Sequence, residues 1–236
     1  MKKKLLLSLL CGGLVLGLAT GCGTSSTDDS KKYDINVNAS ENIDVKTYVD
    51  HDKDYLIVYL TNNNDYNIGS LDVDAKFYDA NGNNLGDDSN TFLDFVSGGN
   101  YVYTVDLPHD DDYNNYVPEK IDLSIQIDQE YQDYVDGGTL YNDKVVTSYT
   151  KSGDEINVTI KNNSGVELYT VDVAVLFMKN GKPIYVDGIS SYLEAGESET
   201  ESIDIPEDWE ASEKADEDVL IDFDSIEFVV NRASAE

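Results

Sequence analysis

Residues 71–82, with the sequence LDVDAKFYDANG, decide the fold of this chain. Apolar side chains occupy every second position from Leu71 to Phe77, and the stretch ends in Asn81-Gly82. A period of two places one set of side chains on the core face of a β-strand and the other set on its solvent face. Asn-Gly favours a tight hairpin because both residues tolerate a positive φ. The stretch therefore predicts a strand that is followed by a hairpin.

The same pattern occurs a second time in the chain. Residues 171–181 repeat the alternation and the Asn-Gly turn, and the flanking strands and turns recur in the same order. Matched pairs include Leu56 and Ile156, Asn62 and Asn162, Leu71 and Val171, Phe77 and Phe177, Gly98 and Gly196, and Pro108 and Pro206. Apolar positions match best, as expected after a duplication whose surface positions then diverged. Several short strands separated by turn signals are typical of a β-sandwich, so each copy is expected to form one.

The N-terminus carries an export pattern. Three lysines at residues 2–4 precede an apolar run at residues 5–18, and small residues at 19–21 lead to Cys22. This run is shorter than the roughly 20 apolar residues of a spanning helix. The order resembles a bacterial lipoprotein signal, which implies that the sulfur of Cys22 carries a diacylglycerol; two acyl chains anchor a protein stably. An ordinary cleaved signal peptide with an incidental cysteine is the alternative.

The expected organisation follows from these two patterns. We predict an all-β protein with two tandem immunoglobulin-like β-sandwiches after a lipoprotein signal peptide and a flexible spacer. The segments are a signal peptide at residues 1–21, a lipid-anchored spacer at 22–40, a first sandwich at 41–130, a linker at 131–140 and a second sandwich at 141–236. One short helix is expected at residues 206–214, with Trp209 folded back on the sandwich.

Residues 62–82 resemble the FxLYD-type and related Ig-like modules of bacterial surface lipoproteins. Those modules have an Asn-rich turn, an alternating valine strand, a Tyr-Asp-x-Asn-Gly hairpin and a Pro-Gly-Glu turn. The second copy keeps the turns at residues 162–163, 180–181 and 195–197, but has Met178 where the family favours tyrosine. The resemblance implies a membrane-tethered protein at the extracytoplasmic face of the cell membrane. Its motifs are structural and bring no catalytic residues.

The charge of the chain restricts its partners. Sixteen basic and 47 acidic side chains give a formal charge of −31. Removal of residues 1–21 leaves 13 basic against 47 acidic side chains, a charge of −34. Such a field repels nucleic acid phosphates. We therefore expect no nucleic acid partner and, besides the membrane at the lipid anchor, a protein or glycan partner. The 17 tyrosines suit recognition, including stacking on sugars, but are equally good strand residues.

The sequence contains no pattern that indicates catalysis. No Gly-x-Ser-x-Gly elbow, phosphate loop, dinucleotide fingerprint or zinc-ligand spacing occurs. We predict a non-catalytic binding or spacer module and no catalytic residues. An accessory subunit or hydrolase acting on cell-wall or extracellular polymers is one alternative, and a Ca²⁺-dependent adhesion module is another.

The calcium alternative depends on one acidic loop. Three aspartates occupy every second position of this loop: Asp50, Asp52 and Asp54. Ca²⁺ prefers hard oxygen ligands in loops. Tyr55 stands where the helical calcium loop needs glycine. A solvated acidic hairpin is the preferred interpretation, so we expect no cofactor, with these three aspartates as the candidate ligands if Ca²⁺ binds.

A second candidate site is apolar. Leu176 and Met178 lie on the predicted outer face of their strand, where the first copy has Lys76 and Tyr78. Exposed apolar stripes tend to mark contacts, so these two residues and Trp209 are candidate binding residues. We prefer the alternative that the stripe is a seam between the two sandwiches or is covered by the Trp209 segment.

Overall fold

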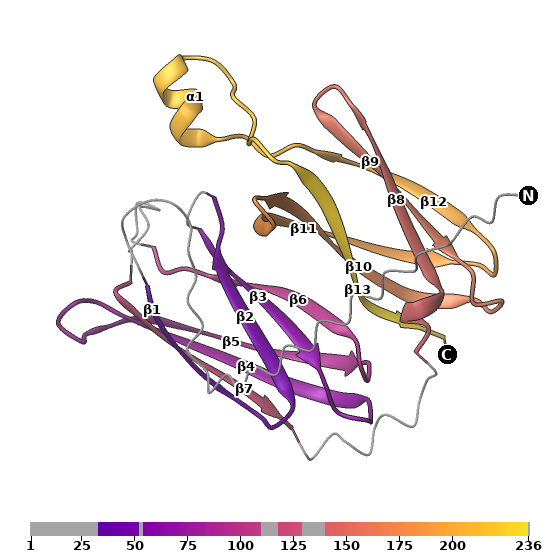
Figure 1. Ribbon diagram of the computed structural model, residues 1–236, viewed down its shortest axis with the longest axis horizontal. Helices are drawn as coiled ribbons and strands as arrows, with labels where there is room; N and C mark the ends of the chain where they lie inside the picture. Colours follow the sequence, from indigo (N-terminus) through magenta and orange to yellow (C-terminus); the bar gives the residue numbers. More distant parts are fainter. Residues whose placement is uncertain (1–32, 52–53, 110–117, 129–139, 236) are drawn as a thin grey trace, which may run out of the picture.

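A computed structural model describes residues 33–51, 54–109, 118–128 and 140–235 (Figure 1). Within these ranges, strands β1 to β13 account for most of the ordered backbone, with one short 3-10 helix and one short α-helix. The strands form four sheets, which pair into two sandwiches. The prediction of an all-β chain with tandem immunoglobulin-like sandwiches is confirmed.

The first module comprises described residues 33–128. Its strands are β1 (Asp34–Ala39), β2 (Ile43–Val49), β3 (Tyr55–Asn62), β4 (Ile68–Tyr78), β5 (Asn84–Phe95), β6 (Asn100–Asp106) and β7 (Lys120–Ile127). One sheet has the order β1-β7-β4-β5 and the other β2-β3-β6. Strand β1 pairs with β7 in parallel, whereas the other pairs are antiparallel.

The second module comprises residues 140–235. Its elements are η2 (Asn142–Lys144), β8 (Val145–Ser152), β9 (Glu155–Asn162), β10 (Leu168–Lys179), β11 (Lys182–Leu193), β12 (Ser198–Asp204), α1 (Trp209–Ala215) and β13 (Ser225–Ser234). The sheets have the orders β11-β10-β13 and β12-β9-β8. Both repeat the arrangement of the first module, apart from β1. The duplication read from the sequence therefore corresponds to a duplicated sheet topology.

Each module has its own apolar core between its two sheets. Leu56 and Val58 from β3 meet Leu71 and Val73 from the opposite sheet in the first core. The second core contains their counterparts Ile156, Val158, Val171 and Val173. All eight side chains are at most 2% exposed. Burying one such side chain contributes roughly 1.5–3 kcal/mol to the stability of the folded state. The period-two alternation of the sequence therefore supplies the core of both modules.

Strand β1 corrects the predicted spacer at residues 22–40. Residues 34–39 pair with β7 along their whole length, and Ile35 is buried in the first core. The predicted linker at residues 131–140 lies mostly outside the described residues, but Leu140 bridges to Ser234 at the end of β13. The folded part therefore begins several residues earlier than the sequence predicts.

The Asn-Gly hairpin of the second module has the predicted geometry. Strand β10 ends at Lys179 and β11 begins at Lys182. Asn180 and Gly181 both have positive φ, 51° and 72°, as a two-residue type I′ turn requires. The corresponding turn of the first module is longer. There the Asp79 carboxylate accepts hydrogen bonds from the side chain and backbone of Asn83, which lower the pKa of Asp79.

We expect Gly181→Ala to lower the free energy of unfolding by about 1 kcal/mol, because an L side chain is strained at positive φ. No atom lies within 4 Å of the added Cβ, so the loss reflects the backbone alone. Urea unfolding measures the change. Gly188→Ala is the matched control, because its Cβ also meets open space but its φ lies outside the positive region. Equal losses in the two variants would contradict the turn assignment.

Helix α1 lies in the connection between β12 and β13 of the second module (Figure 1). Its N-cap is Asp208, whose carboxylate accepts from the Ala211 N–H at 2.9 Å. Its inward residue is Ser212, whose hydroxyl accepts from the Val219 N–H at 2.7 Å. Among the described residues, no helix combines the length and apolarity that crossing a membrane would take.

Candidate functional site

A buried asparagine organises one corner of the first module. Asn62 ends β3 and is 0% exposed. Its Nδ2 donates to the carbonyl oxygens of Tyr66, Phe95 and Val96 at 3.2–3.3 Å. Its Oδ1 accepts from the backbone N–H of Asn64 at 3.0 Å. One side chain thus joins the β3–β4 turn to the end of β5, and buried polar groups of this kind are stabilising only when they are paired in this way.

Asn162 does the same in the second module. Its Nδ2 donates to the carbonyls of Val166, Leu193 and Glu194 at 2.7–3.1 Å, and its Oδ1 accepts from Ser164 N at 2.9 Å. The Asn-Asn turn that the sequence analysis treated as a simple turn signal is therefore a fixed brace in both modules.

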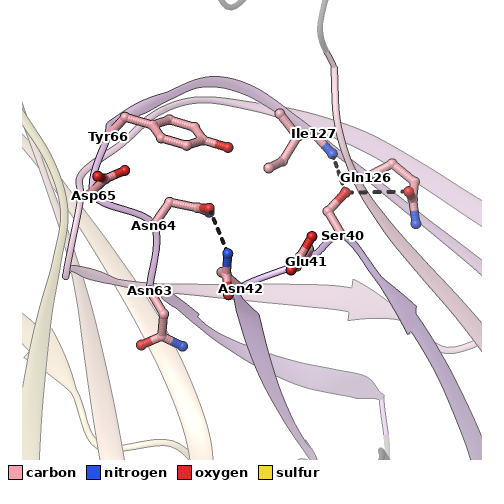
Figure 2. Close-up of a pocket in the computed structure, with 9 residues that line it drawn as sticks. All are labelled: Ser40, Glu41, Asn42, Asn63, Asn64, Asp65, Tyr66, Gln126 and Ile127. Carbon is pink, nitrogen blue, oxygen red and sulfur yellow. Dashed lines mark hydrogen bonds between the residues drawn. The ribbon is translucent and has the colours of Figure 1, made fainter.

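A polar cavity of about 660 Å³ lies beside the brace of the first module. It is within the roughly 300–1,000 Å³ range of small-molecule sites. Three segments form it: the β1–β2 turn, the β3–β4 turn and the end of β7 (Figure 2). The lining residues are Ser40, Glu41, Asn42, Asn63, Asn64, Asp65, Tyr66, Gln126 and Ile127. We call this cavity the corner pocket.

Hydrogen bonds fix part of the corner pocket. Asn42 Nδ2 donates to Asn64 Oδ1 at 3.3 Å, which ties the two turns together (Figure 2). Ser40 Oγ accepts from the Ile127 N–H at 3.0 Å and donates to Gln126 Oε1 at 3.4 Å. Asn42 has a φ of 62°, a conformation that asparagine tolerates better than most residues. The frame of the pocket is therefore set by contacts within the protein.

Other polar groups of the corner pocket face solvent. Glu41 and Asp65 are exposed, and the ring of Tyr66 extends over the hollow towards Ile127 with 44% of the residue exposed (Figure 2). Asn63 points away from the other lining side chains (Figure 2). An exposed ring beside amides and carboxylates offers both a flat apolar surface and hydrogen-bond donors and acceptors.

No pattern in the sequence predicted the corner pocket. Its signal is a difference between the copies: Asn64, Asp65 and Tyr66 stand where the second copy has Ser164, Gly165 and Val166. That difference is readable from the sequence. These three residues form a pocket only because the β1–β2 turn lies beside the β3–β4 turn. That arrangement requires the non-local pairing of β1 with β7.

Two of the three candidate calcium ligands, Asp50 and Asp54, lie among the described residues. Asp50 is 3% exposed, and its Oδ1 accepts from the Tyr55 N–H at 2.8 Å. Asp52 lies outside the described residues, and Asp54 is half-buried. In the described ranges no group of three His, Cys, Asp or Glu side chains is arranged to hold a metal ion.

The candidate residues Leu176 and Met178 lie at the junction of the two modules. They are 1% and 6% exposed and belong to a third apolar cluster. The other buried members are Ile57 and Val102 from the first module and Ala174 and Val229 from the second. Of the two preferred interpretations of the apolar stripe, a seam between the sandwiches and a cover by the Trp209 segment, the structure shows the seam.

Polar contacts reinforce this seam. Asn231 in β13 donates through Nδ2 to the carbonyl of Val102 and accepts through Oδ1 from its N–H, both at 2.9 Å. Val102 lies in β6, an edge strand, so Asn231 takes the place of a neighbouring strand. Arg232 contacts Asp94 at 2.7 Å. The two modules thus share both apolar and directional contacts.

A further pair of contacts joins the β2–β3 turn to the second module. His51 Nε2 lies 2.9 Å from Asp208 Oδ2, and the His51 N–H donates to the carbonyl of Ile184 at 2.7 Å. The backbone hydrogen bond from Ala211 is the main reason why the pKa of Asp208 is lowered, and the hydrogen bond from His51 adds to it. Asp208 is therefore both the cap of α1 and an anchor for the first module.

A second cavity of about 350 Å³ follows the seam. Tyr101 and Tyr103 line it beside Phe92, with ring centroids 5.0 and 4.3 Å from that of Phe92. Burial raises the pKa of both tyrosines to about 12, so their hydroxyls stay protonated near neutral pH. The Asp172 carboxylate at this cavity accepts from Ser190 Oγ at 2.7 Å.

The prediction that Trp209 folds back on the sandwich is wrong. Trp209 begins α1 and is 66% exposed, because Ser212 is the helix residue that turns inward and bonds to Val219. Trp209 stays a candidate contact residue. Cys22, the predicted lipidation site, lies outside the described residues.

Comparison with known proteins gives no family for the chain. No protein-family model matches the sequence, and no curated protein matches it. Among solved structures, a crystal structure of red sea bream transglutaminase matches with 8% sequence identity and a TM-score of 0.25. The match covers 69% of this chain and 29% of that chain, so the chain spans well under half of the length of that structure. A likeness at this level identifies neither a family nor an activity.

Proposed function

We propose that the protein is a lipid-anchored protein at the extracytoplasmic face of a bacterial cell membrane. Its two joined sandwiches act as a non-catalytic binding or spacer unit. The observation that carries this proposal is the N-terminal order of three lysines, a short apolar run and small residues before Cys22. The resemblance of both copies to Ig-like modules of surface lipoproteins supports it.

Only a short segment would connect the lipid anchor to the first sandwich. Ten residues separate Cys22 from Tyr33, the first described residue. A fully extended chain spans at most about 3.6 Å per residue, so the sandwich would begin within about 40 Å of the anchor. Because β1 takes residues 34–39 into the first sheet, the protein would be held closer to the membrane than the predicted spacer suggested.

The seam supports a role as a rigid unit. Two modules that share an apolar cluster, a paired Asn231–Val102 contact and an Arg232–Asp94 ion pair have little freedom to swing. Such a unit can hold a binding surface at a defined distance and orientation from the bilayer. The corner pocket also favours binding over catalysis, because most of its polar groups are amides and hydroxyls, which do not titrate near neutral pH.

Cys22→Ala tests the anchor. We expect the variant to remain as uncleaved precursor and to lose all incorporation of radiolabelled palmitate, because acylation needs the thiol. Cys11→Ala is the matched control and should be processed and labelled like the wild type, since residue 11 lies in the segment that is removed. Labelling that persists in Cys22→Ala would refute the proposal.

A further inference from the structure

The two copies provide an internal comparison for the corner pocket. Both braces, Asn62 and Asn162, bond to the same three backbone carbonyls and the same turn N–H. The β3–β4 turn and its counterpart therefore have equivalent backbone support. The side chain at the first differing position bonds to the brace in both copies: Asn64 Nδ2 donates to Asn62 Oδ1, and Ser164 Oγ donates to Asn162 Oδ1. The side chains of Asp65 and Tyr66 take no part in these hydrogen bonds of the brace.

The side chains that differ in this way are those that line the pocket. The first copy places Asn64, Asp65 and Tyr66 where the second has the smaller Ser164, Gly165 and Val166. Tyr66 is 44% exposed, so burial in the core does not account for its ring. An exposed tyrosine added to a turn that folds without it is suited to contact with a ligand.

The chemistry of the lining suits a sugar. A pyranose ring has a face of C–H groups, which packs on the electron-rich face of an aromatic ring, and an edge of hydroxyls, which both donate and accept hydrogen bonds. Tyr66 supplies the aromatic face, and the Glu41 carboxylate supplies an acceptor. Gln126 bonds to Ser40 and to the carbonyl of Asn38, and Asn42 bonds to Asn64. An amide has two donor hydrogens and two lone pairs, so each of these two amides keeps a donor and an acceptor for a ligand. The cavity volume of about 660 Å³ leaves room for more than one sugar ring.

The charge of the protein selects among sugars. Glu41 and Asp65 place two carboxylates at the pocket, and the complete chain has a formal charge of −31. Anionic polymers, such as those with phosphate or uronic acid groups, would be repelled. An uncharged oligosaccharide meets no such barrier.

We infer that the corner pocket binds an uncharged oligosaccharide, with one sugar ring stacked on Tyr66 and its hydroxyls bonded to Asn42, Gln126 and Glu41. This inference goes beyond the proposed anchoring, and the binding chemistry does not depend on it. The pocket and the tether lie at opposite ends of β1. The tether leads into the first residue of β1, whereas Ser40, which lines the pocket, follows the last residue of β1. A strand of six residues spans about 20 Å, so the pocket lies away from the attachment point.

Calorimetric titration of the processed chain tests the inference. The protein is kept in a zwitterionic detergent without sugar headgroups, and the probes are the β1,4-linked tetramers of N-acetylglucosamine and of glucose and the α1,4-linked tetramer of glucose. We expect saturable binding of at least one probe. Amide shift changes in NMR spectra with that probe should centre on residues 40–42 and 64–66.

Variants at the turn locate the binding. Tyr66→Val should weaken binding about tenfold or more, which corresponds to about 1.4 kcal/mol, while Tyr66→Phe should stay close to the wild type. The triple variant N64S/D65G/Y66V carries the turn of the second copy and should abolish binding. It should stay folded, because a serine at the corresponding position of the second copy makes the bond to the brace. Tyr169→Val is the matched control, because Tyr169 is 46% exposed on the second module.

Two results would overturn the inference: no saturable binding of any of the three probes, or full binding by the triple variant. Failure of the anchor is distinguishable, because Cys22→Ala changes membrane attachment and should leave sugar binding unchanged.

Discussion

Asn162→Asp is expected to lower the free energy of unfolding by about 4 kcal/mol, although it preserves the size and shape of the side chain. The Nδ2 of Asn162 donates to three carbonyls, of which that of Leu193 is buried with it. A carboxylate in its place can only accept hydrogen bonds when it is ionised, so it would face three acceptors without a donor. Protonation to avoid this repulsion has its own cost near neutral pH.

Urea unfolding measures this effect, and the neighbouring residue supplies the control. Asn163 has the same side chain but is exposed, so Asn163→Asp should change the free energy of unfolding by no more than about 0.5 kcal/mol. Burial against three carbonyls raises the pKa of the introduced aspartate in the folded state, so the loss should shrink as the pH falls from neutral towards 4 and should change no further below pH 4. Similar stabilities for the two variants at pH 7 would show that the brace is not needed.

Leu176→Lys is expected to remove about 3 kcal/mol of coupling between the modules, because the apolar seam loses the contacts of a buried leucine and cannot bury an unpaired ammonium group. The variant places at residue 176 the lysine that the first copy carries at residue 76, where the side chain is exposed. Each module has its own core, so both should stay folded while the seam opens. A single unfolding transition in the wild type should then become two.

The reverse change is the matched control for the seam. Lys76→Leu makes the opposite substitution at the equivalent strand position of the first module, on a face that no seam covers. It should change the free energy of unfolding by no more than about 0.5 kcal/mol and leave a single transition. A wild-type unfolding profile for Leu176→Lys would contradict the assignment of this cluster to the interface.

The core strands could be predicted because their signal is local. Alternation along residues 71–77 and 171–177 fixes which side chains face the sandwich interior, and the Asn-Gly turn at residues 180–181 fixes a hairpin. The departure of residues 174–178 from strict alternation predicted either a seam or a cover by the Trp209 segment, and both faces of β10 are in fact buried there. The departure is visible because the corresponding strand of the first copy, β4, keeps polar residues at these outward positions, with Lys76 exposed.

Strand β1 could not be predicted in the same way. Residues 34–39 read DINVNA, a short polar segment in which Ile35 and Val37 give only a weak alternation. The strand is stabilised by parallel pairing with β7, which is more than eighty residues away in the sequence. Because the partner is so distant, the local sequence pattern cannot predict the pairing. The corner pocket depends on this pairing, because Ser40 and Glu41 reach the β3–β4 turn only when β1 is part of the sheet.

The position of helix α1 could be predicted from the sequence, but the direction of its side chains could not. The sequence predicted a helix close to the observed residues 209–215, but it also predicted that Trp209 folds back on the sandwich, and this part is wrong. The orientation of so short a helix is set by contacts at its ends. Asp208 is held by His51 and Ser212 by Val219, and these contacts leave Trp209 on the outer side.

The central claim is that two duplicated sandwiches form one rigid body, which holds the corner pocket in a fixed relation to the rest of the chain. Residual dipolar couplings of backbone amides in both modules test it most directly. We predict that one alignment tensor fits the couplings of residues 33–128 and of residues 140–235 together. Two tensors of different magnitude, one for each module, would contradict the claim.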